Sequence, residues 1–260
     1  SFGMVQGRLT QSPPDCLQWF PQNSWQKEFS TASVLGIDYI ELIAEVQHNA
    51  KNPIWTDEGI VQIKKLVEEN NLTLHALCND YIVEHLFLDE GVIQQNIGLI
   101  EQGSKLGVEK YIMPFFESSE LSDDNMQDYI EPLKRVAKVA YSENITVCLE
   151  TILTGQELIK LLKLIDLPNV KVVYDTGNRV AFGHDLAGDI RLLGDHIAHI
   201  HIKDKNHNNE NVLLGTGLVN FENVFDALHD INYSGPFTFE TTRGSNPIET
   251  AKYNISLVSF

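Results

Sequence analysis

Short apolar runs alternate with longer amphipathic segments along the whole chain. Eight runs are rich in β-branched, aromatic and other apolar residues, namely residues 2–7, 37–43, 72–77, 109–114, 145–150, 170–175, 197–202 and 236–241. The segments between them, such as residues 56–71 and 128–144, place apolar side chains at i, i+3, i+4 and i+7. This spacing is typical of a helix with one buried face. The pattern therefore predicts strands and helices that take turns.

Eight such units in about 250 residues favour an α/β fold of the (β/α)8 TIM barrel type. A doubly wound sheet is the alternative, but no Gly-x-Gly-x-x-Gly motif follows the first predicted strand, which argues against a dinucleotide fold. Thr56, and Thr154 with Glu157 in a capping box, mark two helix starts. No linker or change in composition divides the chain, so we expect a single domain over residues 1–260.

The chain is strongly acidic, with 36 Asp and Glu against 19 Lys and Arg and a net charge of -17. Such a charge repels nucleic acids and anionic membranes, so neither is expected as a partner. The first residues lack a secretory pattern, and no apolar run approaches the roughly 20 residues of a membrane span. Cys16, Cys78 and Cys148 show no CxxC spacing. We expect a soluble protein of the reducing cytoplasm.

Two histidines share one face of the predicted strand at residues 197–202. Because successive side chains of a strand alternate, His199 and His201 point one way and the aliphatic residues around them point the other way. The aliphatic face should meet the helices. We therefore expect both histidines inside the barrel, with His201 near the open end and His199 one layer deeper.

Three of the last four predicted strands end in a carboxylate on the inward face: Glu150, Asp175 and Glu240. One such residue alone is more often a solvated rim residue, but with His201 each of four successive strands carries one metal-capable side chain where barrels have their active site. Crowded carboxylates raise one another's pKa unless a cation lies among them. The four residues therefore predict a divalent metal site. Oxygen and nitrogen ligands without thiolates suit Mn²⁺, with Mg²⁺, Co²⁺ or Zn²⁺ as alternatives.

The motifs around these residues, "CLET", "YDTGN", "HIHIKD" and "PFTFET", together with "LGIDYIEL" and "GTGLVNF", resemble those of the sugar phosphate isomerase/epimerase superfamily. These xylose isomerase-like barrels include ketose 3-epimerases and L-ribulose-5-phosphate 3-epimerase, and the resemblance covers nearly the whole chain. It implies that Glu150, Asp175, His201 and Glu240 bind one divalent ion. It also implies that Glu150 and Glu240 move protons on a ketose through a metal-stabilised enediolate, and that the protein is a homodimer or homotetramer.

Two positions differ from the pattern of free-ketose 3-epimerases. Asn178 stands where many of them have a histidine, and His207 stands where they have a substrate-binding arginine. A "DxGN" followed by an "HxKD" is similar to the phospho-sugar branch. The cations Arg8, Lys203 and Arg243 follow predicted strands and favour an anionic sugar. We therefore expect all five of these residues to bind substrate.

The expected function is a metal-dependent epimerase or isomerase of a ketose or ketose phosphate, with the sugar as its partner. One alternative is a keto-inositol dehydratase-type lyase, which expels a β-hydroxyl after the same proton abstraction. Another is a noncatalytic sugar-binding barrel, although binding alone would not need both Glu150 and Glu240. An apurinic-site endonuclease on this fold would need a basic DNA face, which the acidic chain does not offer.

Overall fold

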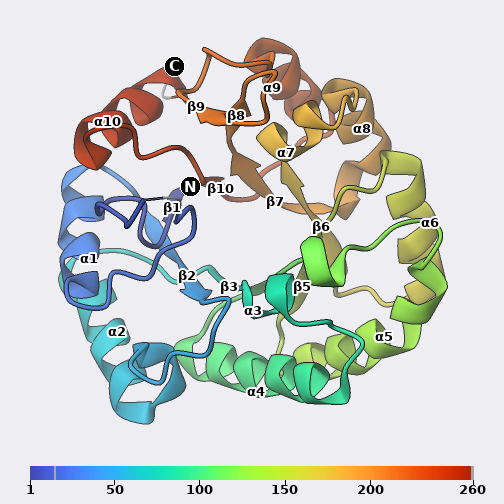
Figure 1. The fold of residues 1–260 in the computed structure, drawn as a ribbon, viewed down its shortest axis with the longest axis horizontal. Coiled ribbons are helices and arrows are strands. Elements are labelled where there is room, and N and C mark those ends of the chain that lie inside the picture. The colour runs from blue at the N-terminus through green and yellow to red at the C-terminus, as the bar shows by residue number, and fades with distance from the viewer. Residues whose placement is uncertain (15, 259–260) are drawn as a thin grey trace.

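Eight parallel strands close into a barrel in the computed structural model, which describes residues 1–14 and 16–258. Neighbours follow the order β1-β10-β7-β6-β5-β4-β3-β2, so that the first and last strands pair and close the ring (Figure 1). The barrel strands are β1 (Phe2–Val5), β2 (Tyr39–Ala44), β3 (Ala76–Asn79), β4 (Lys110–Pro114), β5 (Thr146–Glu150), β6 (Val170–Asp175), β7 (Ile197–Ile202) and β10 (Phe237–Phe239).

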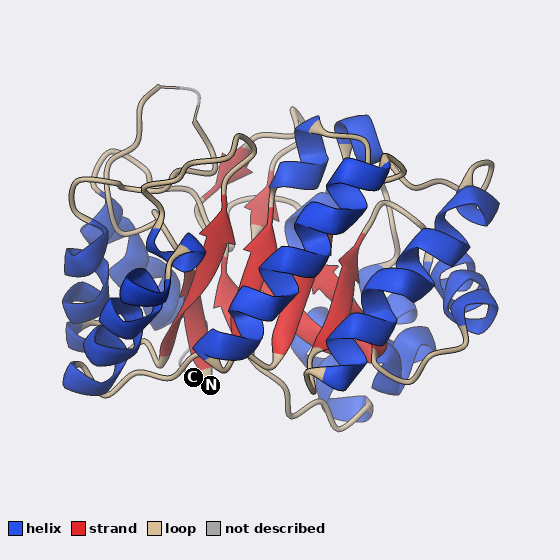
Figure 2. Ribbon diagram, turned by 90° about the horizontal axis from the view of Figure 1, so that it is seen from below, coloured by secondary structure: helices blue, strands red, loops and turns tan. Residues whose placement is uncertain are grey.

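Helices surround these strands on the outside of the barrel (Figure 2). The outer helices are α1 (Trp25–Val34), α2 (Asp57–Glu69), α4 (Glu90–Leu106), α5 (Met126–Ser142), α6 (Gly155–Ile165), α8 (Leu186–Leu193), α9 (Phe221–Asp230) and α10 (Pro247–Val258). The short helices α3 (Tyr81–Glu84) and α7 (Thr176–Ala181) lie nearer the barrel axis (Figure 1), and short 3₁₀ turns lie at Pro53–Trp55, Glu117–Ser119 and Gly194–His196. The fold is the predicted (β/α)8 barrel, and the doubly wound alternative is wrong because the sheet has no free edge.

The sequence also marks the helix ends correctly. The side chain of Thr56 accepts a hydrogen bond from Gly59 N at the start of α2. Thr154 and Glu157 form the reciprocal capping box at the start of α6. Each cap satisfies backbone N–H groups that have no partner within the helix, and it fixes the residue at which the helix begins.

A small hairpin, which the apolar pattern does not predict, extends the loop after β7. Its strands are β8 (Asp204–Lys205) and β9 (Asn211–Val212). The buried carboxylate of Asp204 accepts hydrogen bonds from the backbone N–H groups of Gly215, Gly217 and Val219. The "GTG" turn is therefore folded back onto the end of β7, next to the barrel mouth.

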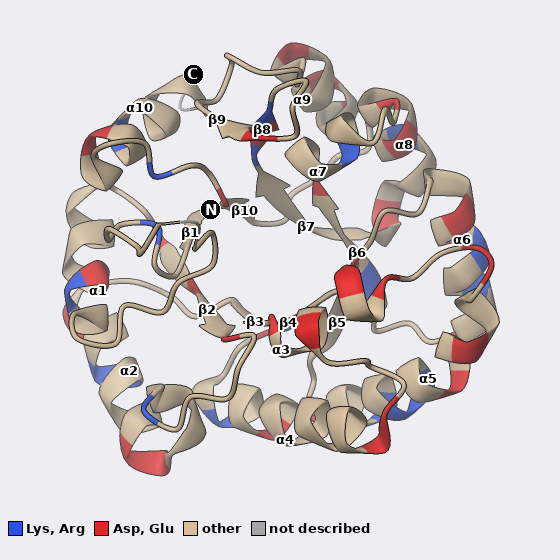
Figure 3. Cartoon of the chain, viewed as in Figure 1, with Lys and Arg blue, Asp and Glu red and all other residues tan. Residues whose placement is uncertain are grey.

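Acidic residues are spread over the outer helices, and others lie at the carboxyl-terminal ends of β6 and β10 (Figure 3). Most of those on the helices are exposed, whereas Asp175 and Glu240 at the strand ends are buried. None of the helices in the described ranges combines the length and the apolar character that a membrane crossing requires.

Candidate metal centre

The four strand-end residues converge at the carboxyl-terminal mouth of the barrel. His201 Nδ1 lies 3.2 Å from Glu240 Oε2, 3.5 Å from Glu150 Oε2 and 3.8 Å from Asp175 Oδ2. One ligand atom from each residue lies within 4.8 Å of the others, and all four residues are buried. The structure thus brings together the set that strand alternation singles out.

A register shift between β6 and β7 aligns two of these residues. Val172 pairs with Ile197, but the next pair is Val173 with His199, so β7 carries one extra residue at this point. Without this shift Asp175 would lie beside Ile200, whereas with it Asp175 pairs with His201. A bulge of this kind re-aims side chains next to functional sites.

Two of the carboxylates are oriented by the start of α7. Asp175 is the N-cap of this helix, and its Oδ1 accepts a hydrogen bond of 2.6 Å from Asn178 N. Asn178 Nδ2 in turn donates to Glu150 Oε1 at 3.0 Å. Each carboxylate therefore has one oxygen held by Asn178 and directs its second oxygen toward His201.

Glu240 and His201 follow the same rule with other partners. Glu240 Oε1 accepts a hydrogen bond from Gln18 Nε2 at 2.8 Å and a longer one from Arg8 Nη2 at 3.5 Å. His201 Nε2 lies 3.0 Å from Glu41 Oε1, a buried carboxylate on β2. Because an ionised carboxylate only accepts hydrogen bonds, Nε2 carries the proton in this contact. Burial acts to lower the pKa of His201, but Glu41 and Glu240 outweigh it and hold that pKa well above its usual value, so without a bound ion the ring also carries a proton on Nδ1. A metal ion would take the place of that proton and bind the Nδ1 lone pair of the neutral ring.

The converging atoms fit a metal ion. Asp175 Oδ2, His201 Nδ1 and Glu240 Oε2 are buried and converge, and Lys203 contacts both of the oxygens. Crowded buried carboxylates carry a free-energy cost that a further cation shared among them would lower. Three carboxylates and one imidazole without a thiolate suit Mn²⁺, Mg²⁺, Co²⁺ or Zn²⁺.

Lys203 adds a buried positive charge at one side of this cluster. Its Nζ lies 2.7 Å from Glu240 Oε2 and 2.9 Å from Asp175 Oδ2. Both contacts are ion pairs between a buried ammonium group and a buried carboxylate oxygen.

The two glutamates occupy contrasting electrostatic surroundings. The pKa of Glu150 is raised to about 8, chiefly by burial and also by the charges of Glu240 and Asp175, against the opposing effects of His201 and Lys203. Burial also acts to raise the pKa of Glu240, but Lys203 and His201 outweigh it and hold that pKa well below its usual value. In the protein without a bound ion, neutral pH therefore favours a protonated Glu150 beside an ionised Glu240.

Glu41, like Gln18, is a site residue that sequence spacing does not single out. Its carboxylate also lies 2.8 Å from His199 Nε2 and accepts a hydrogen bond from Thr238 Oγ1 at 3.1 Å. His199 is thus fully buried one layer below His201, at the depth predicted from strand alternation. The only signal for Glu41 is a charged residue at an inward position of an otherwise apolar strand.

The residues expected to bind substrate are divided between two places. Arg8, Asn178 and Lys203 contact the cluster carboxylates, as described above. His207 lies in the exposed turn between β8 and β9, and no described hydrogen bond or ion pair joins it to the cluster. Arg243 holds the loop after β1, because its guanidinium donates to Gly7 O at 2.8 Å and to three further backbone carbonyls of that loop.

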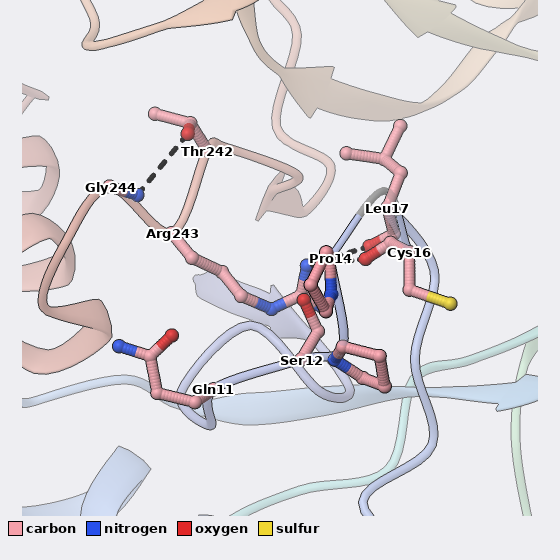
Figure 4. Close-up of a pocket in the computed structure, with 9 residues that line it drawn as sticks. Gln11, Ser12, Pro14, Cys16, Leu17, Thr242, Arg243 and Gly244 are labelled. Carbon is pink, nitrogen blue, oxygen red and sulfur yellow. Dashed lines mark hydrogen bonds between the residues drawn. The ribbon is translucent and has the colours of Figure 1, made fainter.

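A cavity of about 360 Å³ lies where that loop meets the segment after β10. Arg243 and Thr242 line one side of it, and the segment around Cys16 and Leu17 lines the other (Figure 4). The cavity is a feature of the barrel rim, and none of the four cluster residues lines it.

Comparison with known proteins identifies the family. The family model described as "Xylose isomerase-like TIM barrel" matches residues 29–258, which is most of the chain. The chain belongs to this family. Its curated relatives are sugar epimerases, which places the protein among the enzymes of the sugar isomerase and epimerase group.

Two relatives and one solved structure illustrate the likeness. The chain is 23% identical to a probable L-ribulose-5-phosphate 3-epimerase of Mycoplasma pneumoniae, over 90% of this chain and 81% of that protein. It is 26% identical to an L-ribulose 3-epimerase of a Methylomonas species, over 83% and 78% of the two chains. The crystal structure of D-allulose 3-epimerase from Methylomonas superposes with a TM-score of 0.77 at 20% identity, over 99% of this chain and 96% of that one, which shows a shared fold.

Proposed function

We propose that the protein is a divalent-metal-dependent epimerase or isomerase of a ketose or ketose phosphate. The observation that supports this most directly is the convergence of metal-capable atoms from four buried residues, Glu150, Asp175, His201 and Glu240, within 4.8 Å of one another. Relatives named as epimerases of L-ribulose 5-phosphate and of L-ribulose support the substrate class. A cytoplasmic location and a homodimer or homotetramer stay predictions.

Glu150, Asp175, His201 and Glu240 would hold the ion, with Mn²⁺ as our first choice. When bound, the ion would supply positive charge that stabilises the negative charge developing on the oxygen of a ketose carbonyl. His201 would bind the ion through Nδ1 as a neutral ligand, because Glu41 accepts a hydrogen bond from Nε2–H and so holds the ring in that tautomer.

Glu150 and Glu240 would carry out the proton transfers. Each has one oxygen held in place, by Asn178 and by Gln18 respectively, so that its second oxygen has a fixed direction. One carboxylate would remove the proton from the carbon next to the carbonyl, and the other would return a proton to the opposite face. This sequence inverts a stereocentre, whereas return of the proton to the neighbouring carbon gives aldose-ketose isomerisation.

Arg8 and Asn178 would meet the substrate next to these two glutamates, because their side chains already contact them. Lys203 adds a buried cation to the same wall. His207 and Arg243 would reach only the outer part of a substrate, at the rim. This arrangement favours recognition of sugar oxygens close to the reacting carbon.

The test is deuterium uptake in D₂O, followed by NMR. Mn²⁺-loaded and EDTA-stripped protein would be incubated with ketoses, ketose phosphates and keto-inositols. We expect metal-dependent exchange at a carbon next to the carbonyl, and the products would separate epimerisation, isomerisation and dehydration. No exchange with any of these substrates while Mn²⁺ is bound would refute the proposal.

A matched pair of variants tests the role of Glu240. Glu240→Gln should retain Mn²⁺ with reduced affinity yet lose exchange by about 10²-fold or more, the contribution expected of a positioned acid or base. Glu249→Gln makes the same chemical change on α10, where the side chain is exposed and pairs only with Lys252. It should leave exchange unchanged. Unaltered turnover in Glu240→Gln would remove this residue from the mechanism.

A further inference from the structure

The ammonium group of Lys203 lies along one edge of the metal centre. It makes ion pairs with Asp175 and Glu240, which come from β6 and from the end of β10. Among the described residues it makes no ion pair with Glu150, although Glu150 lies beside His201 in the same cluster. A group at the centre of the four ligands would approach all three carboxylates. The centre is therefore left to another cation, and Lys203 bridges two ligands from outside.

The path of the Lys203 side chain is fixed by its neighbours on α7. Thr176 Oγ1 donates a hydrogen bond of 2.6 Å to Lys203 O and accepts one of 3.0 Å from Lys203 N. The aliphatic stem lies against Gly177, where an added Cβ would come within 2.7 Å of Lys203 Cγ. The glycine of the "DTGN" motif therefore leaves room for the lysine, whose backbone is tied at the same point.

The charges of the cluster agree with this reading. With His201 neutral, the buried carboxylates of Glu41, Glu150, Asp175 and Glu240 carry up to four negative charges, and the buried cations of Lys203 and Arg8 balance two of them. A divalent ion balances the remaining two. A buried site is far less costly when its charges are paired in this way.

We propose that Lys203 is a positioning residue that stays on the edge between Asp175 and Glu240 when the ion is bound and holds both carboxylates as ligands. This inference rests on the proposed function. It makes a prediction opposite to that of simple Coulomb repulsion. A positive charge that merely repels or competes with the metal would tighten metal binding when removed, whereas loss of a group that orients two ligands would weaken it.

The experiment compares Lys203→Met with Lys205→Met, which removes the same charge from the same loop. Lys205 Nζ donates to Asn209 in the turn between β8 and β9, and among the described residues it makes no ion pair with a cluster carboxylate. Mn²⁺ affinity would be measured by calorimetric titration, and the electron paramagnetic resonance spectrum of bound Mn²⁺ would report its ligand geometry. We expect Lys203→Met to weaken binding by about 10- to 100-fold and to alter the spectrum, as outer partners of metal ligands do. Lys205→Met should bind like the wild type.

Gly177→Ala provides a second variant that keeps the charge but obstructs the lysine stem. It should weaken Mn²⁺ binding in the same direction, and circular dichroism would show that each variant is folded. Unchanged or tighter Mn²⁺ binding by folded Lys203→Met would overturn the inference, as would a wild-type spectrum in both variants. Wild-type protein that binds no Mn²⁺ would overturn the proposed function as well. Wild-type protein that binds Mn²⁺ without exchanging deuterium would overturn only the proposed reaction.

Discussion

Replacing Glu41 by glutamine should damage both the stability of the barrel and its metal site. In the barrel interior the Glu41 carboxylate oxygens lie 2.8 Å from His199 Nε2 and 3.0 Å from His201 Nε2. A glutamine amide has the same shape but only one acceptor oxygen, and its NH₂ group would face one of the two rings. If it faces His201, that ring must move its proton to Nδ1, the atom that would bind the metal.

The magnitude follows from the surroundings of Glu41. Burial acts to raise its pKa, but His201 and His199 outweigh burial and lower the pKa from 4.5 to about 2. Because one pKa unit is worth about 1.4 kcal/mol, the ionised form contributes about 3 kcal/mol to folding at neutral pH. For an acid whose pKa is lowered by folding, this contribution is present above pH 4.5 and is lost as the pH falls toward 2.

The assay is urea unfolding at pH 7 together with Mn²⁺ titration. We expect Glu41→Gln to lose about 3 kcal/mol of unfolding free energy and about 10- to 100-fold in Mn²⁺ affinity. Glu68→Gln, a change at an exposed position of α2, is the control. A folded Glu41→Gln protein with wild-type stability and wild-type Mn²⁺ affinity would refute the assignment of Glu41 as the partner that orients His201.

Three further predictions concern stability. Burial raises the pKa of Glu28 to about 7, although Gly7 N donates a hydrogen bond to its carboxylate. The protonated form therefore contributes about 3 kcal/mol to folding below pH 4.5, and this contribution is lost as the pH rises through 7. The wild type should lose stability relative to Glu28→Gln between pH 5 and pH 8, and parallel plots of unfolding free energy against pH would contradict this. Asp204→Ala should lower the free energy of unfolding in urea by about 3 kcal/mol or more, because the N–H groups of Gly217 and Val219 lose their acceptor. Amide hydrogen exchange at both residues should become faster, and unchanged exchange at both would contradict the prediction. Free Mn²⁺ at 100 times its Kd should raise the free energy of unfolding by about 2.7 kcal/mol, and EDTA should remove this stabilisation and lower the Tm. An unchanged Tm after EDTA would count against a specific site.

The barrel and the four-residue cluster could be predicted because both depend on local alternation. Each predicted strand overlaps a barrel strand, and the period of two along a strand puts Glu150 and His201 on the inward face without knowledge of the neighbouring strands. The order of strands in a barrel then brings successive carboxyl-terminal ends to one mouth.

Contacts between distant segments could not be predicted in this way. Glu41 reaches His201 across 160 positions of sequence, and only the closed ring makes them neighbours. The bulge that aligns Asp175 with His201 is not marked by any turn residue within the β7 sequence, so its position could not be predicted. Arg243 reads as a free cation, but the loop after β1 surrounds it with carbonyl groups that the sequence does not place.

The pairing of β1 with β10 has a consequence for the order of events during folding. The four residues of the cluster lie in the second half of the chain, yet Glu41, Arg8 and Gln18, which orient two of them, lie in the first 41 residues. A chain in which β1 and β10 have not yet paired therefore lacks the contacts that orient His201 and Glu240. The rate of Mn²⁺ binding during refolding would then report the rate at which the ring closes. Nascent chains would bind the ion only after synthesis of the last strand.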